Sequence, residues 1–138
     1  VVPGEVYMTV DLRNIDEKKL KKAEDLLKQK IKHICLAEKV NVETEQLVRF
    51  KPVNFDKRIS NIIANISDEK GLQCTRLNSG AGHDAQMMAR ICPTSMVFVP
   101  SKDGISHNPR EYTSKEHLNY GLQILYETIN RIDLNLLD

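Results

Sequence analysis

Tryptophan is absent from this sequence, and aromatic residues make up only 5% of its 138 residues. That scarcity argues against a surface on which nucleic-acid bases stack. An excess of one charge sign is lacking too, since 20 lysines and arginines face 19 aspartates and glutamates, for a net charge of +1. Such a balance gives no field that attracts nucleic acid or an anionic membrane. Because no run of about 20 apolar residues exists, we expect no transmembrane helix and no membrane partner.

Cysteine is sparse, and its pattern is not that of a disulfide framework. Cys35, Cys74 and Cys92 are widely spaced, odd in number and form no CxxC pair, which is typical of reduced thiols in a cytoplasmic protein. The sequence also lacks an HExxH motif, a P-loop lysine and any carboxylate cluster with metal-ligand spacing. It opens on Val1 without an initiator methionine or a signal segment, which we interpret as processing or as a piece of a longer protein.

Hydrophobic periodicity divides the chain into two regions of mixed structure. Apolar and polar residues alternate over 5–13 and predict a strand, and helical spacing behind Asp16 predicts a helix from 16 to about 37. The proline-containing stretch 51–54 marks a boundary. The other predicted elements are strands at 40–50, 72–77 and 96–99, and helices ending at Gly71, over 84–91, and beyond a Thr113/Glu116 capping box. We therefore predict an α/β chain, with half of an α+β domain before the boundary and half of an α/β sandwich after it.

Two polar segments follow predicted strands, at the end where α/β proteins bind ligands. Residues 78–85 combine two glycines with His83 and Asp84, so that backbone N–H groups there suit a close ligand. The alternative is that His83 or Asp84 simply caps the next helix. Residues 101–109 contain His107, whose imidazole suits a metal ion, the alternative being a solvated loop histidine.

Three motifs, in order along the chain, resemble one group of enzymes. They are Val1-Val2-Pro3-Gly4-Glu5 with Thr9-Val10-Asp11-Leu12-Arg13, then Ser79-Gly80-Ala81-Gly82-His83-Asp84-Ala85-Gln86, then Gly104-Ile105-Ser106-His107-Asn108-Pro109 with Glu111 and Thr113. The group is the metal-dependent amidohydrolases that cleave carbamoyl and ureido substrates: N-carbamoyl-L-amino acid hydrolase, allantoate amidohydrolase and β-ureidopropionase. The chain resembles a C-terminal portion of such a two-domain enzyme.

The resemblance implies a role for four residues. His107 is implied as the last protein ligand of a centre with two divalent metal ions, zinc or manganese. Arg13 is implied to bind the carboxylate of a small-molecule substrate, and Gly82 and His83 to line the substrate pocket. A guanidinium suits that task because it binds carboxylate bidentately. The structural alternative for Arg13 is a simple ion pair with an aspartate close in sequence, either Asp11 or Asp16.

The resemblance also implies the organisation of the whole enzyme. Residues 1–53 correspond to the second half of a lid that forms a homodimer, and residues 54–138 to the C-terminal part of the catalytic domain. The glutamate general base and the other metal ligands are implied upstream, so no catalytic residue is assigned here and the chain alone is expected to be inactive. Two other hypotheses stay open: a non-catalytic truncated binding or dimerisation fragment, and a peptidase of the same superfamily.

Overall fold

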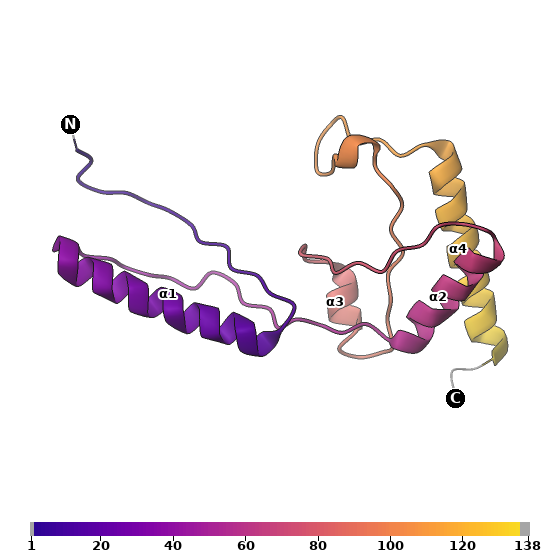
Figure 1. The fold of residues 1–138 in the computed structure, drawn as a ribbon, viewed down its shortest axis with the longest axis horizontal. Coiled ribbons are helices and arrows are strands. Elements are labelled where there is room, and N and C mark those ends of the chain that lie inside the picture. The colour runs from indigo at the N-terminus through magenta and orange to yellow at the C-terminus, as the bar shows by residue number, and fades with distance from the viewer. Residues whose placement is uncertain (1, 136–138) are drawn as a thin grey trace. The chain divides into compact units, whose positions relative to one another are not determined.

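The computed structural model describes residues 2–135 and shows a chain of helices joined by coil. Its elements are α1 (Glu17–Glu38), α2 (Lys57–Glu69), α3 (Asp84–Met88), the 3-10 turn η1 (Lys102–Gly104) and α4 (Lys115–Asn135) (Figure 1). The described residues divide into two compact units. Unit 1 consists of residues 2–53 and 78–81, and unit 2 of residues 54–77 and 82–135.

The predicted α/β class is wrong, because none of residues 2–135 lies in a β-strand. The segments predicted as strands run as coil instead: 5–13, 40–50, 72–77 and 96–99. A strand exists only within a ladder of hydrogen bonds to a neighbouring strand. Among the backbone hydrogen bonds recorded for the described residues, none joins 5–13 to 40–50. The described part of the chain therefore forms neither half of an α/β sandwich nor half of an α+β lid.

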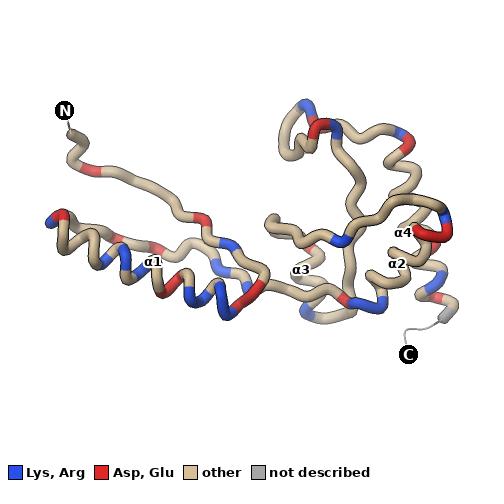
Figure 2. The backbone as a smooth tube through the Cα atoms, in the orientation of Figure 1, with Lys and Arg blue, Asp and Glu red and all other residues tan. Residues whose placement is uncertain are grey.

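Unit 1 is organised by α1, and the predicted helix is confirmed there. The Asp16 side chain accepts hydrogen bonds from the backbone N–H groups of Lys18 and Lys19, which would otherwise lack partners at the helix start. Lys39, in the left-handed region at φ 54°, ends the helix. Acidic and basic residues are interspersed along α1 (Figure 2), while Leu20 is buried. The helix thus exposes a charged face and covers a narrow apolar one.

Arg49 ties the coil that follows α1 back to the helix. Its Nη2 lies 2.8 Å from Glu17 Oε1 and its Nε lies 2.8 Å from Glu24 Oε1. Both hydrogen bonds raise the pKa of Arg49, and the bond to Glu17 makes the larger contribution. The coil before α1, residues 5–13, is not covered in this way. Val6 and Met8 lie on the side that was predicted to be buried, yet they are 65% and 72% exposed.

Unit 2 is built on the packing of α2 against α4. Ile66 is completely buried there, and Ile59 and Ile124 are nearly so. The two buried hydroxyls bond within their own helices, Ser67 Oγ to the Ile63 carbonyl at 2.9 Å and Thr128 Oγ1 to the Ile124 carbonyl at 2.7 Å. Because both hydroxyls are satisfied, the small core carries no penalty for burying them. Two ion pairs link the helices at its edge, Arg131 with Glu69 and Lys70 with Glu127.

Local sequence signals predict the ends of the unit 2 helices to within a few residues. Gly71 follows α2 at φ +66°, as the predicted terminating glycine. The N-cap of α4 differs by one residue from the predicted capping box, because the backbone N–H of His117 donates to Ser114 Oγ at 3.2 Å rather than to Thr113. The short helix α3 covers five residues, fewer than the predicted 84–91.

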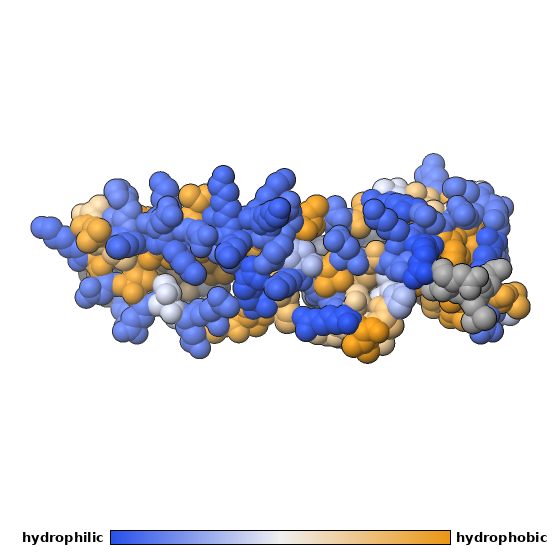
Figure 3. Space-filling view, turned by 90° about the horizontal axis from the view of Figure 1, so that it is seen from below, coloured by the Kyte–Doolittle hydropathy of each residue, from blue (hydrophilic) through white to orange (hydrophobic). Residues whose placement is uncertain are grey.

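Apolar side chains also reach the surface of α4. Its outer stripe is at least half exposed and consists of Leu118, Leu122, Leu125 and Ile129. Apolar patches interrupt the hydrophilic surface seen in Figure 3. None of the described helices combines the length and the apolar character needed to cross a membrane.

Candidate functional site

Arg13 makes the densest set of polar contacts in unit 1. Its Nε lies 2.8 Å from Asp11 Oδ1 and 3.0 Å from Oδ2, and its Nη2 also donates to Oδ2. Its Nη1 donates to the backbone carbonyl of Gly80, 67 residues away in the chain. Hydrogen bonding to Arg13 lowers the pKa of the Asp11 carboxyl, and hydrogen bonding to Asp11 raises the pKa of Arg13. The pair is therefore fully charged near neutral pH, although both side chains are largely exposed.

The contact with Gly80 brings the first predicted motif against the second within unit 1. The turn is closed by the backbone N–H of Ala81, which donates to Ser79 Oγ at 3.2 Å. A Cβ added at Gly80 would meet nothing within 4 Å, and one at Gly82 would meet only Gln86 Oε1, at 4.0 Å. Neither glycine has φ in the left-handed region. The fold itself therefore does not demand glycine at these two positions.

His83 belongs to unit 2 and precedes the first residue of α3. It occupies the N-cap position, yet its side chain makes no capping hydrogen bond, so the capping alternative for His83 is not what the structure shows. The imidazole is half-buried and meets the Phe98 ring edge-to-face, with centroids 5.4 Å apart. This contact orients the His83 ring within unit 2.

His107 lies on the exposed loop between η1 and α4. Its φ of 54° is in the left-handed region, which is uncommon for a residue with a Cβ. The carboxylate of Glu111 holds this conformation, since Oε2 accepts the His107 backbone N–H at 2.8 Å. The Glu111 backbone N–H in turn donates to the Asn108 carbonyl at 2.9 Å. The loop thus fixes the backbone of His107 and leaves its imidazole at the surface.

The metal-binding capacity of these residues is limited. Within residues 2–135, no group of three or more His, Cys, Asp and Glu side chains converges as a metal ion requires. Structural zinc sites take four such ligands and catalytic sites take three. The described residues therefore do not form a metal centre by themselves, and His107 offers a single imidazole donor.

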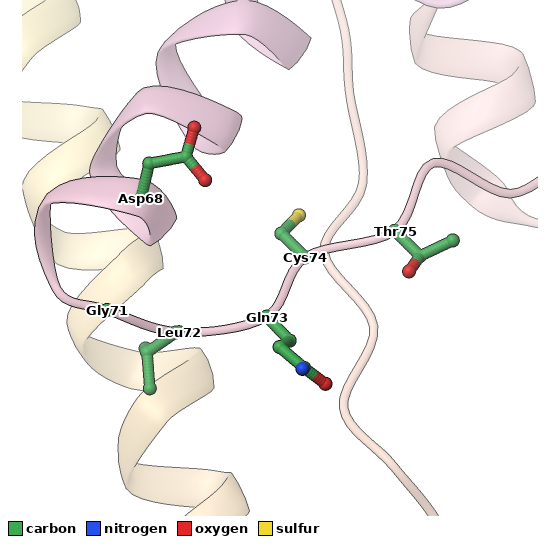
Figure 4. Close-up of a pocket in the computed structure, with 6 residues that line it drawn as sticks. All are labelled: Asp68, Gly71, Leu72, Gln73, Cys74 and Thr75. Atoms are coloured by element: carbon green, nitrogen blue, oxygen red, sulfur yellow. The ribbon is translucent and has the colours of Figure 1, made fainter.

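Two hollows on the surface of unit 2 are not lined by the predicted site residues. One lies at the end of α2 and is lined by Asp68, Gly71, Leu72, Gln73, Cys74 and Thr75. Figure 4 shows Asp68 and Cys74 pointing to one side of the chain and Leu72 and Gln73 to the other. The second is lined by Pro100, Ser101, Lys102, Tyr112, Ser114 and His117. Neither gathers the convergent polar groups that mark a binding pocket.

Sequence reasoning gave no role to two groups that hold the candidate residues. The carbonyl of Gly80 binds Arg13 across a separation of 67 residues, and no local pattern signals such a contact. The carboxylate of Glu111 binds the backbone of His107. An acidic residue four positions after a loop histidine, beyond a proline, was the available signal for this second contact.

Comparisons with known proteins place most of this chain in one family. The family model for peptidase family M20/M25/M40 matches residues 3–131. This chain belongs to that family. It is 35% identical over 132 residues to the allantoate amidohydrolase of Bacillus subtilis, covering 96% of this chain and 32% of that protein. It is 33% identical over 129 residues to the N-carbamoyl-L-amino-acid amidohydrolase of Rhizobium meliloti, covering 94% and 31%.

A solved structure has a similar path of the backbone. The crystal structure of AtUAH in complex with glyoxylate matches with a TM-score of 0.76 and 30% identity, covering 88% of this chain and 29% of that one. The chain thus spans about a third of the length of the relatives it matches. The family is generally metal-dependent.

Proposed function

We propose that this chain is part of an amidohydrolase that cleaves non-peptide C–N bonds in linear amides, with allantoate or N-carbamoyl amino acids as substrates. The observation that carries this is the similarity of 94–96% of the chain to relatives named for those two activities. The family name includes peptidases, but the relatives cited above are named as amidohydrolases, which favours amide over peptide substrates. Because the chain spans a third of their length, we propose that it is inactive alone.

Arg13 is the proposed carboxylate-binding residue of this enzyme. The Arg13 guanidinium has five N–H donors. Asp11 accepts hydrogen bonds along the edge that contains Nε, and the Gly80 carbonyl accepts one from Nη1. Its side chain is 60% exposed, so a donor on each terminal nitrogen has room for a ligand. Glyoxylate, the ligand of the solved relative, is itself a carboxylate, which supports this class of substrate. Gly82, which the fold does not require to be glycine, is proposed to let the substrate approach the backbone beside His83.

His107 is the proposed ligand that this chain gives to a centre of two divalent ions, zinc or manganese. Support comes from its exposed imidazole on a loop whose backbone is held by Glu111. Such a centre supplies the nucleophile by lowering the pKa of a bound water. What this chain adds is the orientation of one imidazole and the binding of the substrate carboxylate.

The test uses the full-length enzyme that contains this chain. Ammonia release is measured with allantoate, several N-carbamoyl amino acids and dipeptides, and the metal content is determined. In Arg13→Ala, loss of a charge-assisted contact costs about 2–5 kcal/mol, roughly 30- to 5,000-fold in kcat/KM. Arg13→Lys recovers only part of it, because an ammonium lacks the fork of a guanidinium.

The matched control is Arg58→Ala, since Arg58 also pairs with an aspartate two residues before it, Asp56. This variant is expected to retain wild-type kcat/KM. Each enzyme is also assayed with the amide analogue of the carboxylate substrate. An equal loss on both substrates in Arg13→Ala excludes the carboxylate-binding role, and turnover of dipeptides alone excludes the amidohydrolase proposal.

We also propose that the enzyme forms a homodimer through unit 1. We propose in addition that it is a cytoplasmic protein. The apolar side of residues 5–13 supports the dimer, with Val6, Met8 and Val10 exposed by 65%, 72% and 58%. The three free cysteines support a reducing compartment. Sedimentation of the full-length enzyme at micromolar concentration tests the dimer, and a stable monomer contradicts it.

A further inference from the structure

Asp11 and Gly80 accept hydrogen bonds from different nitrogen atoms of the Arg13 guanidinium. Asp11 spans the edge formed by Nε and Nη2, while the Gly80 carbonyl accepts from Nη1. Since a guanidinium has two N–H groups on each terminal nitrogen, the hydrogen bonds described leave one on Nη1 and one on Nη2. One donor on each terminal nitrogen thus remains for a second carboxylate, a group that a guanidinium binds through charge-assisted hydrogen bonds.

The two anchors restrict different motions of the same side chain. Asp11 lies two residues away on the same coil, so it fixes the plane of the guanidinium relative to its own backbone. Gly80 lies in the glycine turn that belongs to the same unit, so it fixes how far the guanidinium reaches toward that turn. An arginine side chain that is not anchored samples many rotamers, and a ligand must overcome that entropy on binding. Anchoring in advance removes part of that cost.

We propose that Asp11 is a positioning residue, which holds the Arg13 guanidinium so that its terminal N–H pair faces the substrate carboxylate. This inference rests on the proposed function of Arg13. The opposite arrangement is that Asp11 competes with the substrate for the guanidinium, as a neighbouring anion does when it shares the same donors. The two arrangements predict opposite effects of replacing Asp11. Removing a positioning residue weakens substrate binding, whereas removing a competitor strengthens it.

Asp11 is a suitable residue for substitution, because its side chain is 65% exposed and contributes nothing to a core. In the full-length enzyme, Asp11→Ala is expected to raise KM for the carboxylate substrate about 10- to 100-fold, the usual cost of losing a residue that orients a ligand-binding group. The value of kcat and the KM of the amide analogue are expected to stay within about twofold, because binding of the carboxylate end is what changes. Asp11→Asn keeps one acceptor oxygen and is expected to recover part of the loss. The control is Asp25→Ala, which removes one exposed negative charge from α1 in the same unit.

A double-mutant cycle with Arg13→Ala completes the test. If Asp11 acts through Arg13, Asp11→Ala has no further effect on KM once Arg13 is replaced. An unchanged or lower KM in Asp11→Ala, or equal effects in both backgrounds, overturns the inference. These results differ from a failure of the proposed function itself, in which Arg13→Ala loses equally on the carboxylate and amide substrates. Equal melting temperatures of wild type and Asp11→Ala show that a change in KM does not come from unfolding.

Discussion

Replacing Gly121 by alanine tests the packing of unit 2 directly. Gly121 lies within α4, and a Cβ built on it would come 2.5 Å from Cγ1 of Val99. Carbon atoms that are not bonded pack best at about 3.5–4.0 Å, so the overlap is about 1 Å. Val99 has little freedom to yield, because a β-branched side chain is stiff at χ1.

Two effects of opposite sign decide the stability of Gly121→Ala. Alanine in place of glycine stabilises a helix interior by about 1 kcal/mol. Overpacking of a filled site costs about 1–3 kcal/mol. The expected net change is therefore a destabilisation of about 0–2 kcal/mol, instead of the gain that helix propensity alone gives. In a Val99→Ala background, where Cγ1 is missing, the same substitution is expected to stabilise by about 1 kcal/mol.

The measurement is urea unfolding of the full-length enzyme for the four members of this cycle. Their coupling energy should be about 1–3 kcal/mol, since the two positions touch. Asn119→Ala, an exposed substitution in the same helix, controls for propensity and is expected to be neutral or slightly stabilising. If Gly121→Ala stabilises wild type as much as it stabilises Val99→Ala, the coil at Val99 does not pack on α4 and the reasoning is refuted.

Two further predictions concern a pH-dependent ion pair and the loop of His107. Hydrogen bonds from Arg131 lower the pKa of the Glu69 carboxyl, so the stabilisation by this pair is present above the ordinary carboxyl pKa and is lost as the pH falls through the lowered value. Urea midpoints of Glu69→Gln should fall less on acidification than those of wild type, and parallel curves contradict this. Glu111→Ala is expected to lower metal affinity about 10- to 100-fold in a chelator competition, because the backbone of His107 loses its anchor. Glu111→Gln retains an acceptor and should recover part of the affinity, whereas equal metal retention in all three proteins argues against the anchor.

The helices were predictable because their signals are local. Asp16 caps α1 and Gly71 follows α2 in the left-handed region, and each acts within a few residues of its own position. The start of α4 shows the limit of such signals. Thr113 and Ser114 are both good capping residues, and the backbone selects the second. A sequence pattern therefore locates a helix well and its first residue less well.

The predicted strands were wrong, because a strand forms only beside a partner strand and a local pattern does not identify that partner. The alternation over 5–13 predicts a buried side, yet Val6 and Met8 are exposed because none of the described residues covers them. The candidate site divides in the same way. The pair of Arg13 with Asp11 follows from a spacing of two residues, whereas the contact of Arg13 with Gly80 spans 67 and needed the structure.

The two apolar faces of α4 connect the fold with the proposed function. Ile124 and Thr128 face α2 and are buried, while Leu122 and Leu125 lie on the remaining surface and are 64% and 50% exposed. A helix that is apolar on more than one face is typical of the interior of a larger protein. The matched relatives are about three times as long as this chain, since it covers 28–32% of them. We propose that additional chain completes a catalytic unit around unit 2. Such chain would cover the exposed stripe of α4 and would supply the further metal ligands that the proposed role of His107 requires.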